Sequence, residues 1–226
     1  MAKYLCLLDN TLIQIKENSF RLYQLGFKMF AFKRLCIYCG ANSGISPIYV
    51  DAAIKLGVTL AEKNISLIYG GGRKGLMGII ANAVLNHGGE VVGVIPEFLL
   101  EKELGHTAIT KLHVVKNMHE RKALMAELAE GFIIMPGGAG SLEEFFEIWT
   151  AGQLGLHQKP CGILNIGDYY NYILKFIDHA VESQFIQSVY RDMLLIDDSP
   201  EGLLEKFSVY KAPKDLKWME INKIEA

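Results

Sequence analysis

The chain has 226 residues, of which 50% are hydrophobic and 21% are charged, so it is long and apolar enough for one large domain with a substantial core. Its formal net charge of −2 argues against a general binder of nucleic acid or other polyanions, although a small anionic ligand needs only a few local donors. No apolar run approaches the roughly 20 residues that span a membrane, and the short N-terminal run is interrupted by Asp9. We therefore expect a cytoplasmic protein that binds neither nucleic acid nor membrane.

Strand-like and helix-like stretches alternate along the chain from residue 34 onward. Short apolar runs predict strands at 34–39, 66–69, 90–95, 111–115, 132–135 and 160–166. Helices are expected at 47–64, 76–86, 118–130, 141–155, 168–184 and 200–207, and an irregular loop or short helix at 97–110. Continuous apolar strands between amphipathic helices are typical of a doubly wound, Rossmann-like α/β fold, whose mostly parallel sheet has helices on both faces.

The alternating pattern also suggests the domain organisation. Residues 34–226 are expected to form a single Rossmann-like domain. Residues 1–33 do not follow the pattern, and we interpret them as an N-terminal extension to which the sequence assigns no role.

The four cysteines are too few for a disulfide scaffold in a chain of this length. Cys36 and Cys39 form a C-x-x-C pattern, but they lie on a predicted strand, where residues three apart point to opposite faces. We interpret them as buried structural thiols. The six histidines show no H-x-x-x-H spacing, so no metal site is expected.

Three glycine-bearing loops, 40–44, 70–75 and 137–140, each follow a predicted strand. The carboxyl ends of parallel strands share one edge of the sheet, where ligands of such folds bind. The middle loop, GGGRKG, has the G-x-G-x-x-G spacing of a dinucleotide site, but it follows the second strand, and the expected acidic residue lies beyond Pro96, at Glu97. Glycines needed only for a tight turn are an alternative. There is no Walker loop and no nucleophile elbow.

The stretch MPGGAGSLEE has two interpretations. Ser141 and Glu144 have the S-x-x-E spacing of a capping box, which needs no function. The preceding PGGAG instead favours a phosphate site, because glycines let an anion approach the N–H groups at a helix start.

The helix that follows VVKN has a mixed face of Met118, Arg121, Lys122 and Met125. This face is either a solvated basic edge beside core methionines or an apolar slot for a flat base with an arginine for an oxygen anion.

Three motifs in this order, YGGGRKGLMG, NMHERK and PGGAGSLEE, resemble the Lonely Guy family of cytokinin riboside 5′-monophosphate phosphoribohydrolases, many of which were once labelled lysine decarboxylases. The hallmark P-G-G-x-G-[T/S]-x-x-E falls on residues 136–144, with Ser141 where most members have threonine. The resemblance covers about residues 34–210.

The resemblance implies hydrolysis of the N-glycosidic bond of an adenosine 5′-monophosphate, N6-modified or plain, with release of the free base and ribose 5-phosphate. It places the catalytic roles on Arg121 and Glu144 and needs no cofactor. The pocket would include Ala41 to Gly44. The candidate substrate-binding residues lie in the two later glycine loops and on the helix between them: Gly71, Gly72, Gly75, Met118, Lys122, Gly137, Gly138, Gly140 and Ser141.

The family is usually dimeric, so a homodimer is expected. Phe145, Ile148 and Trp149 could pack against a partner subunit, although burial within one subunit fits equally. A non-catalytic nucleotide or cofactor carrier of the same fold is the alternative function. The G-x-G-x-x-G loop follows the second strand and not the first, which argues against a nicotinamide-dependent oxidoreductase. A decarboxylase has no support, because the sequence shows no Schiff-base lysine with a partner for the pyridinium nitrogen of pyridoxal.

Overall fold

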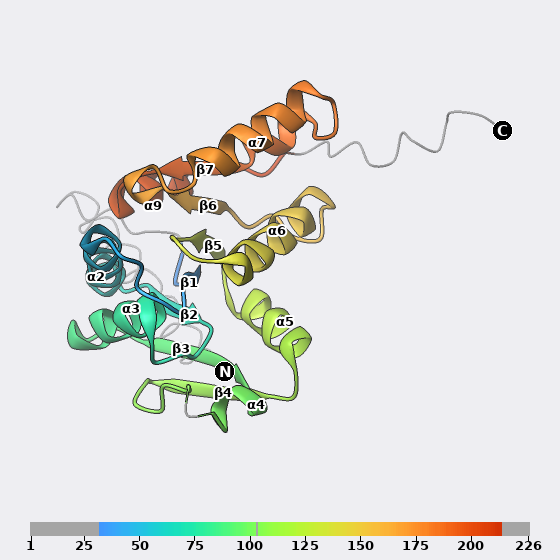
Figure 1. Cartoon of the computed structure of the whole chain (residues 1–226). Coiled ribbons are helices and arrows are strands. Elements are labelled where there is room, and N and C mark those ends of the chain that lie inside the picture. Colours follow the sequence, from blue (N-terminus) through green and yellow to red (C-terminus); the bar gives the residue numbers. More distant parts are fainter. Residues whose placement is uncertain (1–31, 103, 214–226) are drawn as a thin grey trace, which may run out of the picture. The chain divides into compact units, whose positions relative to one another are not determined.

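The computed structural model describes residues 32–102 and 104–213 of the chain. The part of the predicted extension up to residue 31, which includes Cys6, lies outside these described residues. Within them, one sheet runs through the domain with helices on both of its faces (Figure 1).

The sheet has seven strands in the order β4-β3-β2-β1-β5-β6-β7, and every neighbouring pair is parallel. This arrangement confirms the predicted doubly wound fold. The strands are β1 (Arg34–Tyr38), β2 (Ser66–Tyr69), β3 (Val91–Pro96), β4 (Lys111–Val115), β5 (Gly131–Ile134), β6 (Cys161–Leu164) and β7 (Leu194–Asp197). The central strands β5 and β6 are buried along their whole length, which explains their unbroken apolar sequence.

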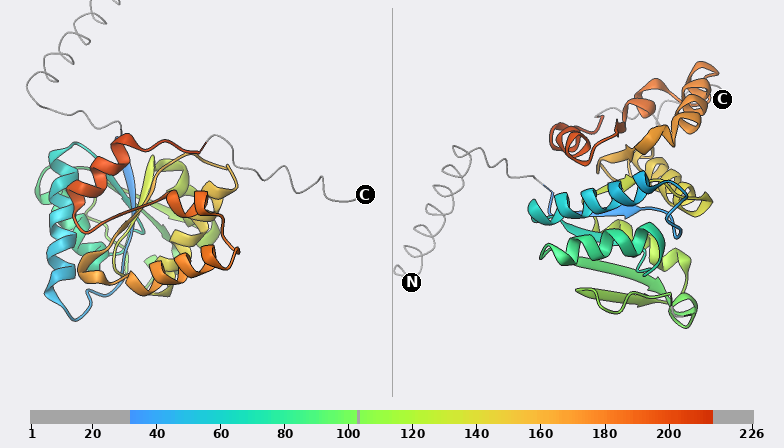
Figure 2. Two further views of the ribbon diagram at one scale, coloured as in Figure 1. Left: turned by 90° about the horizontal axis from the view of Figure 1, so that it is seen from above. Right: turned by 60° about the vertical axis from the view of Figure 1, so that its left-hand side comes forward.

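Each predicted helix begins and ends within three residues of its expected bounds, and eight α-helices occur in the described residues. They are α2 (Pro47–Glu62), α3 (Gly75–Asn86), α4 (Glu97–Leu100), α5 (Met118–Leu128), α6 (Ala139–Gln153), α7 (Asn171–Glu182), α8 (Ser188–Asp192) and α9 (Pro200–Val209). Helices α2, α3 and α9 cover one face of the sheet, and α5 and α6 cover the other (Figures 1 and 2). Among the described residues, no helix combines the length and the apolar character that a membrane span needs.

Two features of the C-terminal third differ from the prediction. The strand β7 and the short helix α8 were missed, because elements of four and five residues carry too little periodicity to mark them. The single helix expected at 168–184 is instead a 3₁₀ turn, η1 (Ile166–Asp168), followed by α7. Gly167 and Asp168 have left-handed φ angles of 58° and 60°, which an α-helix cannot contain.

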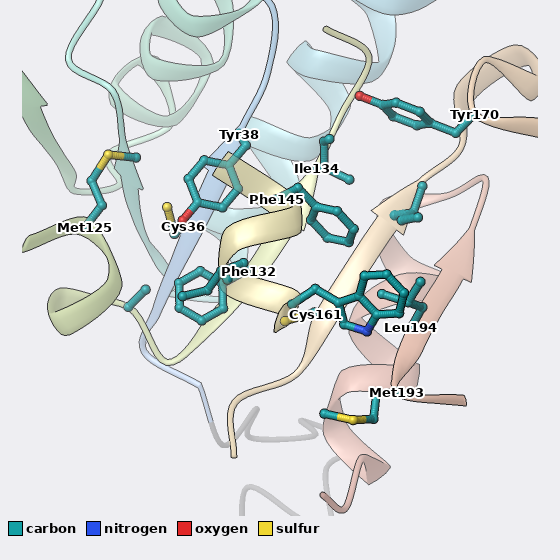
Figure 3. Packing of buried hydrophobic residues seen from close by; sticks show 14 of the residues in the cluster. Cys36, Tyr38, Met125, Phe132, Ile134, Phe145, Cys161, Tyr170, Met193 and Leu194 are labelled. Atoms are coloured by element: carbon teal, nitrogen blue, oxygen red, sulfur yellow. The ribbon is translucent and has the colours of Figure 1, made fainter. Parts of the chain in front are cut away.

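The core on the α5 and α6 face is built largely from aromatic residues and sulfur-bearing side chains (Figure 3). Tyr38 of β1 stacks on Phe132 of β5, with 6.3 Å between ring centroids. Phe145, Ile148 and Trp149 of α6 are at most 7% exposed within one subunit, so they fill this core rather than a subunit contact.

The described cysteines match their interpretation as structural thiols. Cys36, Cys39 and Cys161 are free and buried, and burial raises the pKa of each thiol well above its usual range. No group of three or more histidine, cysteine or carboxylate side chains in the described part of the chain is placed to hold a metal ion.

The strand order creates a single switch point in the sheet. From β1 the chain continues to α2 on one face, whereas from the neighbouring β5 it continues to α6 on the other face. The loops after these two strands therefore diverge and leave a crevice at the carboxyl edge, where ligands of doubly wound folds bind.

Candidate active site

A cavity of about 440 Å³ lies at the switch point between β1 and β5. The loops after the two strands are joined at its base, where the N–H of Gly40 donates to the carbonyl of Pro136 at 3.0 Å. The early glycine loop, the later glycine loop, and residues of α2, α3, α5 and α6 line the cavity. Two of the three predicted glycine loops therefore meet at one site.

The later glycine loop forms the start of helix α6, two residues earlier than predicted. Gly138 is the N-cap and Ala139 the first helical residue, so Ser141 is the third residue of the helix. The capping-box interpretation is wrong: no side chain caps this helix, and the Glu144 carboxylate pairs with Arg121 instead. The cap prediction failed because glycines themselves can adopt the N-cap conformation.

This helix start is open toward the cavity. Gly138 and Gly140 line the cavity, and a Cβ atom added to either would meet no atom within 4 Å. The first N–H groups of a helix have no intrahelical acceptor and carry a partial positive charge. A Cβ on Gly137 would lie 2.3 Å from Ser141 Oγ, so Gly137 is needed for the loop to pack over that hydroxyl. The combination of free N–H groups and bare backbone suits an oxygen anion.

The second feature of the cavity is a buried ion pair. Arg121 Nη1 lies 3.1 Å from Glu144 Oε1, and the two side chains are only 9% and 10% exposed. Arg121 comes from the first turns of α5. The start of this helix is capped by the Asn117 side chain, which accepts from the N–H of Glu120 at 2.9 Å. Both partners line the cavity.

The other two nitrogens of Arg121 each donate to a backbone carbonyl. Its Nε donates to the carbonyl of Val94 at 3.2 Å, and its Nη2 donates to the carbonyl of Gly70 at 3.4 Å. A Cβ on Gly70 would lie 1.9 Å from that nitrogen, so the first glycine of GGGRKG makes room for the arginine. These contacts fix the guanidinium group with Nη1 facing the carboxylate of Glu144.

Burial shifts the ionisation of the glutamate. Desolvation raises the pKa of Glu144 above its usual range, and the positive charge of Arg121 partly opposes this shift. A carboxylate with a raised pKa is a stronger base than an exposed one. The ion pair keeps it charged and oriented, which are the properties required of a general base.

Part of the cavity wall is apolar. Leu76, Met77, Met118, Tyr49 and Tyr169 line it, and the rings of the two tyrosines meet edge to face with 5.7 Å between centroids. Met118 was among the predicted site residues. The others were missed, because Tyr49 and Leu76 fit core positions of their helices and Tyr169 was expected inside a helix.

Four predicted substrate-binding residues lie outside the cavity lining: Gly71, Gly72, Gly75 and Lys122. Segment 104–106 covers the first two, since Gly72 forms a bridge with Gly105 and the N–H of His106 donates to Gly71.

Gly75 and Lys122 each serve a structural contact. A Cβ on Gly75, which has a φ of 61°, would lie 2.2 Å from the backbone of Ala41. Lys122 pairs with Glu143 and Glu147 on α6. The G-x-G-x-x-G loop therefore supports the site by packing against Arg121 and Ala41. It does not present its backbone to a ligand as the loop of a dinucleotide-binding site would.

These features define a Rossmann-like α/β protein whose switch-point cavity combines a glycine-rich helix start with a buried arginine–glutamate pair. Comparison with protein-family models matches residues 77–207 to the family described as "Possible lysine decarboxylase". The chain is 46% identical over 179 residues to cytokinin riboside 5′-monophosphate phosphoribohydrolase LOG1 of Arabidopsis thaliana, covering 79% of this chain and 84% of that protein. It is 43% identical over 198 residues to LOG7 of the same plant, covering 85% and 91%. The chain belongs to this family of cytokinin riboside 5′-monophosphate phosphoribohydrolases, as the three motifs predicted.

Solved structures with the same fold are more distant in sequence. The molybdenum cofactor binding protein of Rippkaea orientalis is 19% identical, with a TM-score of 0.59 over 76% of this chain and 93% of that one. The molybdenum cofactor carrier protein of Chlamydomonas reinhardtii is 16% identical, with a TM-score of 0.58 over 76% and 93%. These similarities support the Rossmann-like fold alone.

Proposed function

We propose that the chain hydrolyses the N-glycosidic bond of an adenosine 5′-monophosphate that carries a cytokinin-type N6 substituent, and releases the free base and ribose 5-phosphate. The observation that carries this proposal is the buried Arg121–Glu144 pair beside an open, glycine-rich helix start in one cavity. The family membership agrees with it.

The 5′-phosphate would bind at the start of α6. Gly138, Gly140 and Ser141 line the cavity there, and the helix supplies free N–H groups and its positive dipole end. Glu144 follows Ser141 by three residues, a rise of about 4.5 Å along a helix. A phosphate at the helix start therefore places the sugar of the same nucleotide close to the carboxylate.

The reaction would use Glu144 as the general base. Its carboxylate takes a proton from water, the water oxygen forms a bond to C1′ of the ribose, and the bond from C1′ to the base nitrogen breaks. The proton returns through Glu144 to the departing base. Positive charge develops on the ribose as the bond breaks, and the same carboxylate stabilises it.

Arg121 would act through Glu144 and not on the phosphate. Its Nε and Nη2 are bonded to backbone carbonyls, and its Nη1 faces the glutamate. The apolar wall of Leu76, Met77 and Met118 would hold the flat base and its substituent.

Two other activities have weaker support. Among the described residues that line the cavity there is no lysine, whereas pyridoxal-dependent decarboxylation needs one for its Schiff base. A non-catalytic nucleotide or cofactor carrier would gain nothing from a carboxylate buried beside its anion site, because like charges repel.

We further propose a homodimer that works in the cytoplasm. Helix α7 and the turn after it expose the large apolar side chains of Tyr172, Phe176 and Phe185, which are 83%, 63% and 88% exposed and are suited to a subunit contact. The three free cysteines of the described part suit a reducing compartment. Light scattering of the purified chain tests the dimer directly.

Incubation of the purified protein with AMP and with N6-isopentenyl-AMP tests the activity. We expect equal amounts of ribose 5-phosphate and free base to appear, with the prenylated nucleotide preferred. Binding of both nucleotides without any product would support the carrier function. Absence of product from any nucleoside monophosphate would overturn the hydrolase.

A further inference from the structure

The later glycine loop contains two adjacent glycines, and its geometry therefore needs an external constraint. Glycine adopts positive and negative φ angles with similar ease, so the peptide unit between Gly137 and Gly138 could rotate at little cost. In a planar peptide the C=O of one residue and the N–H of the next point in opposite directions. The orientation of the Gly137 carbonyl therefore decides where the N–H of Gly138 points.

A tyrosine hydroxyl holds this carbonyl. Tyr169 Oη donates to the carbonyl oxygen of Gly137 at 2.7 Å, although the two residues lie 32 positions apart in the sequence. Its neighbour Tyr170 donates to the carbonyl of Met135 at 2.7 Å. The two successive tyrosines thus bind the two carbonyls on either side of Pro136, which begins the loop.

The segment that carries the tyrosines is itself rigidly held. The side chain of Asn165, which is 9% exposed, accepts from the N–H of Tyr170 and donates to the side chain of Asn171, both at 2.8 Å. Asp168 has a φ of 60°, a conformation that costs a non-glycine residue free energy and is retained where the surroundings impose it. A Cβ on Gly167 would lie 2.5 Å from Ile48 Cδ1, so the turn also packs closely on α2.

Tyr169 also faces the cavity. It is one of the lining residues and is 42% exposed, whereas Tyr170 is 1% exposed. The ring of Tyr169 is held by two edge-to-face contacts, with Tyr49 at 5.7 Å and with Tyr170 at 4.9 Å between centroids. The hydroxyl is therefore presented to the loop by a fixed ring and not by a freely rotating side chain.

We infer that Tyr169 is a positioning residue for phosphate: it locks the Gly137–Gly138 peptide in the orientation in which the N–H of Gly138 faces the anion. This inference rests on the proposed function of the loop as the phosphate site. It assigns the selectivity for the phosphorylated ribose partly to a residue outside the glycine motif, carried by the segment between β6 and α7.

The test is Tyr169→Phe, which removes the hydroxyl and keeps the ring. Tyr172→Phe is the matched control, because Tyr172 is 83% exposed and does not line the cavity. Calorimetry of the full chain would measure the affinities for ribose 5-phosphate and for free adenine, neither of which requires turnover. We expect Tyr169→Phe to weaken ribose 5-phosphate binding about 3- to 10-fold, as expected for one lost neutral hydrogen bond, and to leave adenine binding unchanged.

Three outcomes would overturn the inference, and they are distinguishable. Unchanged ribose 5-phosphate binding in Tyr169→Phe refutes the lock while the proposed function stands. Equal weakening for ribose 5-phosphate and adenine indicates a general structural role. No ribose 5-phosphate binding by the unmodified chain refutes the phosphate site itself, and with it the proposed function of the loop.

Discussion

Replacement of Glu144 by glutamine is the sharpest test of the candidate site. Glutamine has nearly the same shape and retains an oxygen that can accept from Arg121, but it can neither take a proton from water nor carry negative charge. We expect kcat for the nucleotide to fall about 100-fold or more, the usual effect of losing general acid–base assistance. Because the 5′-phosphate site is untouched, the affinity for ribose 5-phosphate should not fall.

The cost in stability follows from the ion pair. Two unit charges about 4 Å apart attract by about 4 kcal/mol at an effective dielectric constant of about 20. Most of this is offset because both groups are desolvated, at 9% and 10% exposure. The amide retains a hydrogen bond worth about 1 kcal/mol. We therefore expect the free energy of unfolding to fall by only about 1 kcal/mol or less, which for a domain of this size lowers Tm by at most about 2–4 °C.

The assay combines steady-state kinetics on N6-isopentenyl-AMP with thermal unfolding of the same samples. Glu147→Gln is the control, because Glu147 lies one turn further along α6, pairs with Lys122 at 2.8 Å and does not line the cavity. It should keep its activity. Full activity in Glu144→Gln, with the control unchanged, would refute the assignment of Glu144 as the base.

Four further predictions use the same cavity. The acid limb of the pH profile of kcat/KM should lie above the usual glutamate pKa of 4.5, because burial raises the pKa of Glu144, and an acid limb at or below that value would contradict its role. The folded state binds this proton more tightly than the unfolded state, so the stability contributed by Glu144 falls as pH rises through the raised pKa, and Glu144→Gln should destabilise more at pH 4 than at pH 7 in denaturant titrations. Gly140→Ala should raise Tm, because alanine is favoured over glycine in a helix by roughly 0.5–1 kcal/mol, yet weaken ribose 5-phosphate binding by placing a methyl group in the open helix start; undiminished binding would show that the anion lies elsewhere. Gly70→Ala should lower both Tm and kcat, because its Cβ would lie 1.9 Å from Arg121 Nη2; wild-type kinetics would show that the arginine position is unimportant.

The fold was readily predicted because its central strands are buried on both faces. A strand such as GFII of β5 leaves no polar position to confuse the pattern. The edge strand β7 was missed for the opposite reason. It is four residues long and only partly buried over its last three, so its pattern is too short to distinguish a strand from an irregular segment.

The site was predicted where its residues lie in one motif and missed where they come together only in the fold. Gly138, Gly140 and Glu144 belong to one stretch of sequence. Tyr49 and Tyr169 reach the cavity from segments 120 residues apart, and neither has a local pattern that marks it. Only the tertiary structure brings them together, because the left-handed turn before Tyr169 is set by contacts with other segments.

The two interpretations of the S-x-x-E spacing differ by where the helix begins, and this shift has a functional consequence. If Ser141 were the N-cap, Glu144 would turn back to its own helix start, and its negative charge would occupy the N–H groups that an incoming phosphate needs. With the start at Ala139, those N–H groups stay open, and Glu144 lies one turn further on, toward Arg121. The glycines before Ser141 thus do more than admit a ligand. Because Gly138 is the N-cap, the Glu144 carboxylate is not used to cap the helix and is available for catalysis. Gly70 has no side chain, and this leaves the space that Arg121 occupies when it pairs with Glu144.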